Sequence, residues 1–192
     1  MPRAALSRDE IEAFRSRALE AAEELFAEGG VAGVTMRALS KALGCSPMTA
    51  YRYFDNQEHL MAALRAQAFG RLALSQRAAA EATEEPLARI KALRLAYIRF
   101  AIDEPHAYQL MFSFRPPREP RPELDASARE SFAHLLEASK EAVASGVLEG
   151  DGERLAHLLW AELHGLVSLH VADKLNFGLT LKDLAEHSLL SL

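Results

Sequence analysis

The amino-acid sequence predicts an all-α fold, in which a three-helix head is followed by a body of about six helices. Apolar residues recur at three- and four-residue steps along most of the 192-residue chain, which is the spacing of one helix face. Glycine and proline interrupt this periodicity at intervals that suit helix ends. We find no convincing strand pattern, and 49% hydrophobic residues is ordinary for a globular chain that buries a core.

The first helix is predicted from Arg8 to Ala27, with Ser7 as its N-cap. Its apolar face is formed by Ile11, Phe14, Ala18, Ala22 and Leu25. Glycine suits a helix C-terminus and permits a tight reversal of the chain. We therefore expect the helix to end at the glycines that follow, Gly29, Gly30 and Gly33.

Two short helices are predicted next. Thr35 can cap the first of them through its hydroxyl, and Gly44 ends it. Serine as a cap with proline at the first helical position opens the second helix at Ser46-Pro47, and this helix continues to about Phe54. Two helices joined by a glycine-containing turn form the helix-turn-helix arrangement. Residues 1–54 are therefore predicted to be a helix-turn-helix domain.

Six further helices are predicted in the rest of the chain. Asp55 and Glu58 resemble a capping box that opens a connecting helix over about residues 55–80. The body, residues 81–192, is predicted to hold helices at about 87–103, 106–114, 123–144, 153–175 and from 181 to the C-terminus. Four prolines in the segment from Arg115 to Pro122 indicate an exposed, weakly ordered loop.

Charge is distributed unevenly along a chain whose net charge is −5. No acidic residue occurs from 29 to 54, whereas Arg37, Lys41 and Arg52 lie inside that window, which indicates a defined contact surface for nucleic acid. A single cysteine, Cys45, excludes an intramolecular disulfide, and its position in the turn favours a packing role over a redox role. No stretch has the length of a signal peptide or a membrane span, so we expect a cytoplasmic protein without a membrane partner.

The second helix of the helix-turn-helix carries side chains suited to DNA. Met48, Thr49, Arg52 and Tyr53 share one face, while Ala50 and Phe54 point toward the core. Arginine can read guanine edges or bind phosphate, threonine can contact a base, and the tyrosine hydroxyls can bond phosphates. The residue types alone also fit a short connecting helix in an all-α enzyme or scaffold.

The head nevertheless resembles a known family. The segments Thr35-Met36-Arg37-Ala38-Leu39-Ser40 and Gly44-Cys45-Ser46-Pro47-Met48-Thr49-Ala50-Tyr51-Arg52-Tyr53-Phe54 closely resemble the N-terminal signature of TetR-family transcriptional regulators. The resemblance implies a dimer whose two heads meet successive major grooves of a palindrome. It also implies that DNA is contacted by Thr35, Arg37, Ser46, Met48, Thr49, Tyr51, Arg52 and Tyr53. Gln57 stands where the family usually has a lysine, which weakens or removes one phosphate contact, and Val31 replaces an aromatic residue.

The body is less informative. The segment from Leu159 to Leu166 resembles the tryptophan-histidine-glycine signature of one TetR subgroup, which implies a ligand-responsive domain. The helix from residue 153 is apolar almost all round, which indicates burial against the chain itself and against a partner subunit. Residues assigned to dimerisation are Leu155, Leu159, Leu166, His170, Leu181 and Leu184, and the final helix also carries Leu189 and Leu190.

A ligand pocket is the other expectation for the body. Its candidate residues are aromatic, polarisable or histidine side chains: Tyr97, Phe100, Tyr108, Met111, Phe112, His134, Trp160 and His164. Such residues at helical spacing also form an ordinary core, so this interpretation stays open. The apolar character of the set favours a hydrophobic or aromatic effector.

The function predicted from these features is a dimeric repressor that a small, largely apolar effector releases from a palindromic DNA operator. We expect no cofactor and no enzyme activity, because no nucleophile elbow, phosphate loop or dinucleotide fingerprint is present. His157, His164 and His170 are spaced by seven and six residues, which does not suit metal chelation on a helix. An architectural DNA-binding protein without a ligand, or an all-helical enzyme, remains as an alternative. The architectural protein predicts a solid core in the body, and the repressor predicts a cavity.

Overall fold

The computed structural model describes residues 7–112, 117 and 119–186. Over those residues the chain forms helices and no strand, as the sequence predicts. The helices are α1 (Arg8–Gly33), α2 (Met36–Ala42), α3 (Pro47–Ala50), α4 (Gln57–Glu81), α5 (Pro86–Asp103), α6 (Pro105–Phe112), α7 (Pro122–Ala144), α8 (Gly152–Val171) and α9 (Leu181–Glu186).

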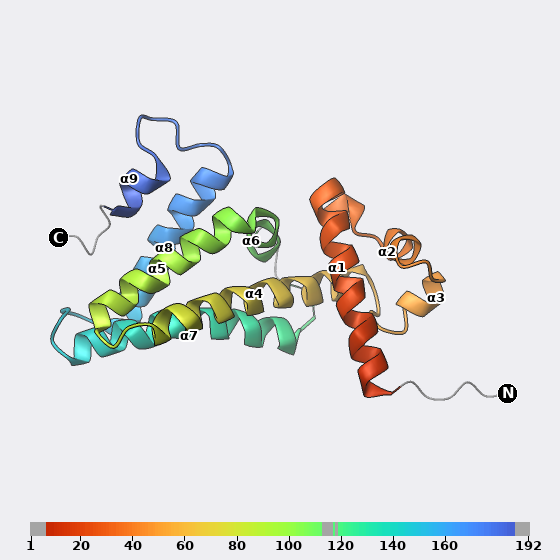
Figure 1. Cartoon of the computed structure of the whole chain (residues 1–192), viewed down its shortest axis with the longest axis horizontal. Helices are drawn as coiled ribbons and strands as arrows, with labels where there is room; N and C mark the ends of the chain where they lie inside the picture. Colours follow the sequence, from red (N-terminus) through yellow and green to blue (C-terminus); the bar gives the residue numbers. More distant parts are fainter. Residues whose placement is uncertain (1–6, 113–116, 118, 187–192) are drawn as a thin grey trace.

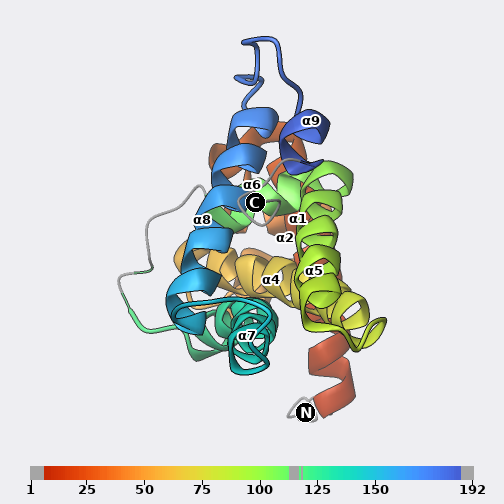
Figure 2. The same cartoon turned by 90° about the vertical axis from the view of Figure 1, so that its left-hand side faces the viewer.

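The helices α1 to α3 form a head at one end of an elongated molecule (Figure 1). α4 leaves the head and runs the length of the body, with α7 alongside it. Seen end-on, α8 and α5 lie on opposite sides of the body, with α4 between them and α7 below (Figure 2). α4 contacts α5 and α7, and α8 contacts both of these helices as well. The body is therefore a helical bundle that shares its longest helix with the head.

The first helix begins and breaks for the reasons that its sequence predicts. Ser7 accepts a hydrogen bond from the Glu10 backbone N–H, and the Glu10 carboxylate accepts one from the Ser7 N–H, which completes a capping box. The helical backbone is interrupted at Gly30, where φ is 59°. A second helical turn follows before Val34. A Cβ atom built at Gly33 would lie 2.7 Å from the Leu25 carbonyl oxygen, so this position requires glycine.

The hydrophobic core of the head reaches into the body. Leu39, Ala50 and Phe54 are fully buried and pack with Leu60 from the first turn of α4. Leu110 from α6 is also fully buried in this cluster. α6 thus contributes a side chain to the core of the head. Because the core is closely packed, a movement of α6 would displace side chains of the head.

An ion-pair cluster also joins the head to the body, and we call it the Arg71 clamp. Arg71 on α4 binds both carboxylate oxygens of Glu23 on α1, at 2.6 and 3.3 Å. Its Nε donates to Glu104, between α5 and α6, at 2.7 Å. Burial alone would lower the pKa of Arg71, but the two carboxylates overcome this effect and raise it. Three segments are therefore held together by one guanidinium.

Several element boundaries differ from the sequence-based expectations. The first helix runs past Ala27, and α8 ends at Val171 rather than near Leu175. α4 begins at Gln57 and is capped by Asn56, whose side chain accepts from the His59 N–H at 2.8 Å, so the capping box assigned to Asp55 and Glu58 is wrong. Asparagine caps as well as aspartate, and the helix starts one residue later. α3 ends at Ala50 and continues as a turn rather than as a helix to Phe54.

Some expectations concern residues that the structure does not describe. Residues 113–116 and 118, within or beside the predicted proline-rich loop, fall outside the described ranges, as do Leu189 and Leu190. Within the described ranges, no helix is long and apolar enough to cross a membrane.

Candidate functional site

The helix-turn-helix is shaped by two capping interactions and one glycine. Thr35 accepts a hydrogen bond from the Ala38 N–H at 3.1 Å and begins α2. Ser46 accepts from the Thr49 N–H at 3.3 Å and begins α3. Between them Gly44 adopts a φ of 62°, a conformation that other residues adopt at a cost. These interactions fix the angle at which α3 leaves α2 and projects from the head.

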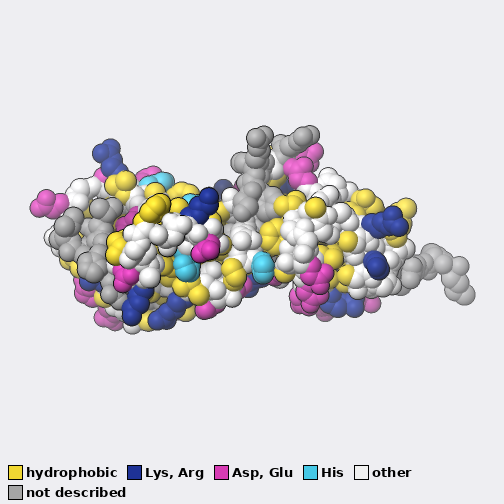
Figure 3. All heavy atoms as spheres, turned by 90° about the horizontal axis from the view of Figure 1, so that it is seen from above, with side chains coloured by type: hydrophobic (Ala, Val, Ile, Leu, Met, Phe, Trp, Pro, Cys, Tyr) yellow, Lys and Arg dark blue, Asp and Glu magenta, His cyan; other side chains and the backbone are white. Residues whose placement is uncertain are grey.

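Five of the eight predicted DNA-contact residues lie on the exposed surface of the head. Arg37, Ser46, Met48, Tyr51 and Arg52 are exposed, and Met48 is 74% exposed, which is unusual for a large apolar side chain. Arg37 and Arg52 form no ion pair with any described residue. Basic side chains are visible at the head end of the molecule in Figure 3. This surface combines positive charge with an exposed apolar side chain, two features that are compatible with the major groove of DNA.

The other three predicted DNA-contact residues are half-buried. Thr35, which caps α2, is half-buried. The Thr49 hydroxyl lies 3.0 Å from the Ser46 hydroxyl. The Tyr53 ring stacks on Phe14 of α1, with ring centroids 4.0 Å apart, so much of this side chain belongs to the packing of the head. Sequence reasoning placed Tyr53 with Met48 and Arg52 on one helix face, and the turn after Ala50 changes that orientation.

Two other positions singled out in the sequence are now placed. Gln57 is exposed in the first turn of α4. Cys45 is half-buried in the turn, and its N–H donates to the Ser40 carbonyl at 2.9 Å. Its backbone thus helps to close the turn between α2 and α3.

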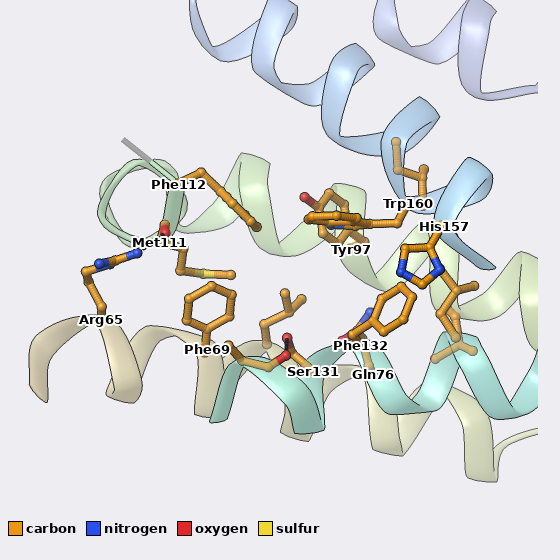
Figure 4. Close-up of a pocket in the computed structure, with 15 residues that line it drawn as sticks. Arg65, Phe69, Gln76, Tyr97, Met111, Phe112, Ser131, Phe132, His157 and Trp160 are labelled. Carbon is orange, nitrogen blue, oxygen red and sulfur yellow. Dashed lines mark hydrogen bonds between the residues drawn. The ribbon is translucent and has the colours of Figure 1, made fainter. Parts of the chain in front are cut away.

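The body contains a cavity of about 370 Å³. Side chains from α4, α5, α6, α7 and α8 surround it, and most of them are apolar or aromatic (Figure 4). The lining residues are Arg65, Phe69, Leu72, Gln76, Leu93, Tyr97, Met111, Phe112, Ala128, Ser131, Phe132, Leu135, His157, Trp160 and Leu163. A cavity of this volume falls within the range of small-molecule sites.

Half of the predicted pocket residues line this cavity. Tyr97, Met111, Phe112 and Trp160 do so. The other four, Phe100, Tyr108, His134 and His164, are not among its lining residues.

Phe100 packs in the core of the body, and His134 is half-buried on α7. A helix face seen in sequence cannot tell which side meets a void and which side meets a neighbour, and this ambiguity accounts for the difference.

The wall contributed by α4 was missed by sequence reasoning, which treated α4 only as a connection. Arg65, Phe69, Leu72 and Gln76 follow each other at four-, three- and four-residue steps and share one face of the helix. A polar residue at each end of an apolar helix face was the signal available in the sequence.

Tyr108 and His164 belong to a hydrogen-bond network beside the cavity. The Tyr108 hydroxyl lies 2.8 Å from His164 Nδ1 and 3.2 Å from the Ser168 hydroxyl, and the Tyr97 hydroxyl lies 3.3 Å from His164 Nδ1. Burial raises the pKa of both tyrosines and lowers that of His164. The network is therefore neutral. His164 Nδ1 has one lone pair in a neutral ring, so at most one of the two tyrosine hydroxyls donates to it. The Tyr97 hydroxyl donates to the Tyr108 hydroxyl at 3.5 Å. A more open pocket of about 270 Å³ lies on the other side of this network and shares Phe112 with the main cavity.

Two of the six residues assigned to dimerisation are buried within their own chain. Leu159 and Leu181 are only 1% and 5% exposed, so they pack in the core of their own chain. Leu155, Leu166 and Leu184 are half-buried, and His170 is exposed. The exposed apolar face of α8 is instead formed by Leu158, Ala161, Gly165 and Leu169. A shift of one position around a helix apolar on all sides moves a side chain from the surface to the core.

Over the described ranges, no group of three or more histidine, cysteine, aspartate or glutamate side chains is placed to hold a metal ion.

Two parts of the chain match families of known proteins. Residues 18–64 match the family of bacterial regulatory proteins of the tetR type, and residues 90–192 match the tetracycline repressor-like C-terminal domain. An uncharacterized HTH-type transcriptional regulator of Mycobacterium tuberculosis is 33% identical over 112 residues. That match covers 58% of this chain and 55% of the relative, so the chain aligns with about half the length of the curated protein.

Solved structures share the fold over nearly the whole chain. A protein of unknown function from Rhodococcus sp. RHA1 has a TM-score of 0.79 and 26% identity, covering 96% of this chain and 92% of its own. The fatty acid degradation regulator FadR from Bacillus halodurans has a TM-score of 0.71 and 18% identity, covering 89% and 93% of the two chains. The matched families consist of transcriptional regulators rather than enzymes. The chain belongs to the tetR family of bacterial regulatory proteins.

Proposed function

We propose that the chain is a dimeric, sequence-specific repressor in the cytoplasm that leaves a palindromic operator when a small, largely apolar effector enters the body. The observation that carries this proposal is the cavity of about 370 Å³, because it lies in the helical body, away from the helix-turn-helix. Residues 1–54 form the DNA-binding domain, α4 connects it, and residues 81–192 form the effector and dimerisation domain.

The head supports DNA binding through its exposed residues. Met48 lies on α3, and Arg52 lies on the turn that follows it. We assign both residues, together with Thr49, to base edges in the major groove. Arg37, Thr35, Ser46, Tyr51 and Tyr53 are assigned to the phosphate backbone. Gln57 lacks the charge for a strong phosphate contact. Tyr53 could make its contact only through its hydroxyl edge, because its ring is stacked on Phe14.

The cavity favours a regulator over an architectural protein. An architectural protein gains nothing from a void, since each missing contact lowers stability. A void lined by Tyr97, Trp160 and other aromatic side chains can be filled by an apolar molecule that restores those contacts. Effector binding would then shift the population between two arrangements of the heads, provided that the effector favours one of them.

Two connections could carry that shift to the head. Leu110 belongs to α6, whose next two residues, Met111 and Phe112, line the cavity, and Leu110 itself is buried in the core of the head. The Arg71 clamp joins α1 to α4 and to the corner between α5 and α6. An effector that displaces Met111 or Phe112 would therefore act on a helix that is packed against the head.

For the dimer, we propose the exposed apolar face of α8 as the partner surface. Leu158 is 55% and Leu169 is 44% exposed on this face, and Gly165 between them allows close approach of another helix. Leu158→Glu should convert the dimer to a monomer in size-exclusion chromatography with light scattering. Leu74→Glu is the matched control, because Leu74 is 66% exposed on α4, away from this face. A dimer that persists in Leu158→Glu contradicts this assignment.

The central experiment is selection of bound sites from a random DNA pool, followed by affinity measurements at two salt concentrations. We expect a palindromic motif, with Arg52→Ala relaxing or losing it. If Arg52 contacts a base, each half-site loses about 1–3 kcal/mol of discrimination. Arg99→Ala removes an exposed arginine of α5 in the body and should leave the motif unchanged. No enriched motif from an intact dimer would refute the sequence-specific regulator and favour an architectural role.

A further inference from the structure

One face of α4 forms a long wall of the cavity. Arg65, Phe69, Leu72 and Gln76 all line it, and the first and last of them are eleven residues apart. At a helical rise of 1.5 Å per residue this separation is about 16 Å along the helix axis. Figure 4 shows Arg65 beside Met111 at one end of the cavity and Gln76 toward the end where Phe132 and His157 lie. The wall is therefore polar at both ends and apolar between them.

Gln76 is a buried polar side chain that lacks a partner for its oxygen. Gln76 is 4% exposed, and no donor among the described residues forms a hydrogen bond with its Oε1. A buried amide oxygen without a hydrogen bond is costly, so a natural protein rarely leaves one on an apolar wall without a use. A bound molecule with an O–H or N–H group at this end would satisfy it.

His157 lies at the same end, and its exposed side chain is held against its own helix. Its Nδ1 lies 2.8 Å from the Glu153 carbonyl oxygen, and because a carbonyl can only accept, Nδ1 carries a hydrogen. The buried acceptor that calls for a donor at this end of the cavity is Gln76 Oε1.

Arg65 provides the opposite chemistry at the other end. Among the described residues that line the cavity it is the only arginine or lysine, and it is half-buried. Its Nη2 donates to the Met111 carbonyl at 3.1 Å, which holds the guanidinium against the end of α6. A planar guanidinium in a partly desolvated position matches the geometry of a carboxylate, which it can bind through two parallel hydrogen bonds.

Between these ends the wall offers only apolar contacts. Phe69 and Leu72 lie on α4 between the two polar residues, and Met111, Phe112 and Tyr97 face the same space. Phe69 and Phe112 meet edge to face, with ring centroids 5.6 Å apart. Ser131 of α7 also lines the cavity, but its hydroxyl already donates to the Ala128 carbonyl at 2.9 Å. A ligand that spans the cavity therefore meets mainly apolar side chains along its middle.

We propose that the effector is an elongated amphiphilic acid, whose carboxylate binds Arg65, whose apolar chain lies along α4, and whose far end donates a hydrogen bond to Gln76. This inference rests on the proposed function, because it names the chemical class of the molecule that the body detects. An extended chain of about twelve carbons spans a comparable length, at roughly 1.2 Å per bond by analogy with an extended polypeptide.

The test uses three probes of equal chain length. These are ω-hydroxydodecanoic acid, dodecanoic acid, which lacks the far hydroxyl, and dodecanediol, which lacks the charge. Trp160 is the single tryptophan of the chain and lines the cavity, so its fluorescence reports binding without DNA. Binding measured in this way is independent of the operator experiment. If no probe binds, the proposal that the chain is a sequence-specific regulator still stands. If no operator motif is found, the affinities of the three probes can still be measured.

Wild-type protein should bind ω-hydroxydodecanoic acid about tenfold more tightly than either other probe, as expected for one well-placed hydrogen bond or ion pair. In Gln76→Leu the preference over dodecanoic acid should disappear, while dodecanoic acid still binds. In Arg65→Gln the preference over dodecanediol should disappear. Gln67→Leu is the matched control: Gln67 also lies on α4 with an unpartnered Oε1, but it does not line the cavity, so all preferences should persist.

Three results would overturn the inference. Equal affinity of the wild type for all three probes would show that neither end group is recognised. No binding of any probe by folded wild-type protein would exclude this ligand class. Loss of the same preferences in Gln67→Leu would show that the substitutions act through the packing of α4 rather than through the cavity. Thermal melts of each variant establish that the compared proteins are folded.

Discussion

The Arg71 clamp gives a sharp test of how the head is held against the body. Arg71→Ala removes two contacts to Glu23 and one to Glu104, so it releases α1 and the corner between α5 and α6 from α4 together. We expect a lower free energy of unfolding, and a head that is less tightly coupled to the body. The matched control is Arg77→Ala, also on α4, which breaks an exposed pair with Glu81 within the same helix.

The magnitude follows from exposure. The side chains of Arg71 and Glu23 are 30% and 29% exposed, so this pair is partly desolvated but reached by salt. Charge-assisted bonds of this kind lie between the 0.2–1 kcal/mol of exposed pairs and the roughly 3 kcal/mol of buried ones, which suggests a loss of about 2 kcal/mol for the whole clamp. For a chain of this length that corresponds to about 4–8 °C in Tm. The side chains of Arg77 and Glu81 are 62% and 66% exposed, and their loss should cost at most about 0.5 kcal/mol.

The assay is thermal and urea unfolding of the full chain at one protein concentration, because the stability of a dimer depends on concentration. Repeating it at high salt should narrow the difference between wild type and Arg71→Ala. A Tm shift for Arg71→Ala no larger than that of Arg77→Ala would refute the reasoning. The clamp would then be a surface contact without energetic weight.

Three other outcomes are expected. Gly33→Ala should lower the free energy of unfolding in urea by about 1–3 kcal/mol, because a Cβ would meet the Leu25 carbonyl. In the control Gly29→Ala a Cβ meets nothing within 4 Å, so no comparable loss is expected. Equal effects of the two substitutions would contradict this explanation. Burial lowers the pKa of His164 in the folded chain below the ordinary histidine value of about 6.5. Above that pH the imidazole is neutral in both the folded and the unfolded chain. As the pH falls below it, the unfolded chain binds the proton more readily, so the folded chain loses stability. His164→Gln should therefore weaken the loss of stability between about pH 8 and about pH 5, and an unchanged pH profile would exclude His164 as its source. Leu110→Ala should cost about 2–5 kcal/mol, since the side chain is fully buried; a loss below about 1 kcal/mol would deny its role in joining α6 to the head.

Sequence reasoning was most successful where a local signal decides the structure. The hydroxyl caps at Ser7, Thr35 and Ser46 are formed as predicted, because a cap depends only on residues two or three positions away. Ala50 at the end of α3 and Phe54 after the following turn are both buried, as their four-residue spacing predicts. Asn56 shows the limit of such signals, since two adjacent residues could cap α4 and the sequence does not choose between them.

The pocket could be predicted only in part. Tyr97 and Trp160 were recognised as aromatic residues on helices that enclose one core, and they line the cavity. His134 has similar chemistry but does not line it. Arg65 and Gln76 were missed, because a polar residue on a connecting helix is usually solvated, and only the positions of α6 and α7 show that both face the cavity.

The sequence by itself determined the helical fold, the helix-turn-helix and its family, since these depend on local periodicity, caps and an ordered set of motifs. The tertiary structure decided what each helix face meets. Leu158 and Leu159 are neighbours on a helix that is apolar all round, yet one is exposed and the other is in the core. The same distinction separates Gln67 from Gln76 on α4, of which only Gln76 lines the cavity. The physical reason is that periodicity defines faces within a helix, whereas the packing of distant segments decides whether a face meets solvent, a neighbour or a void.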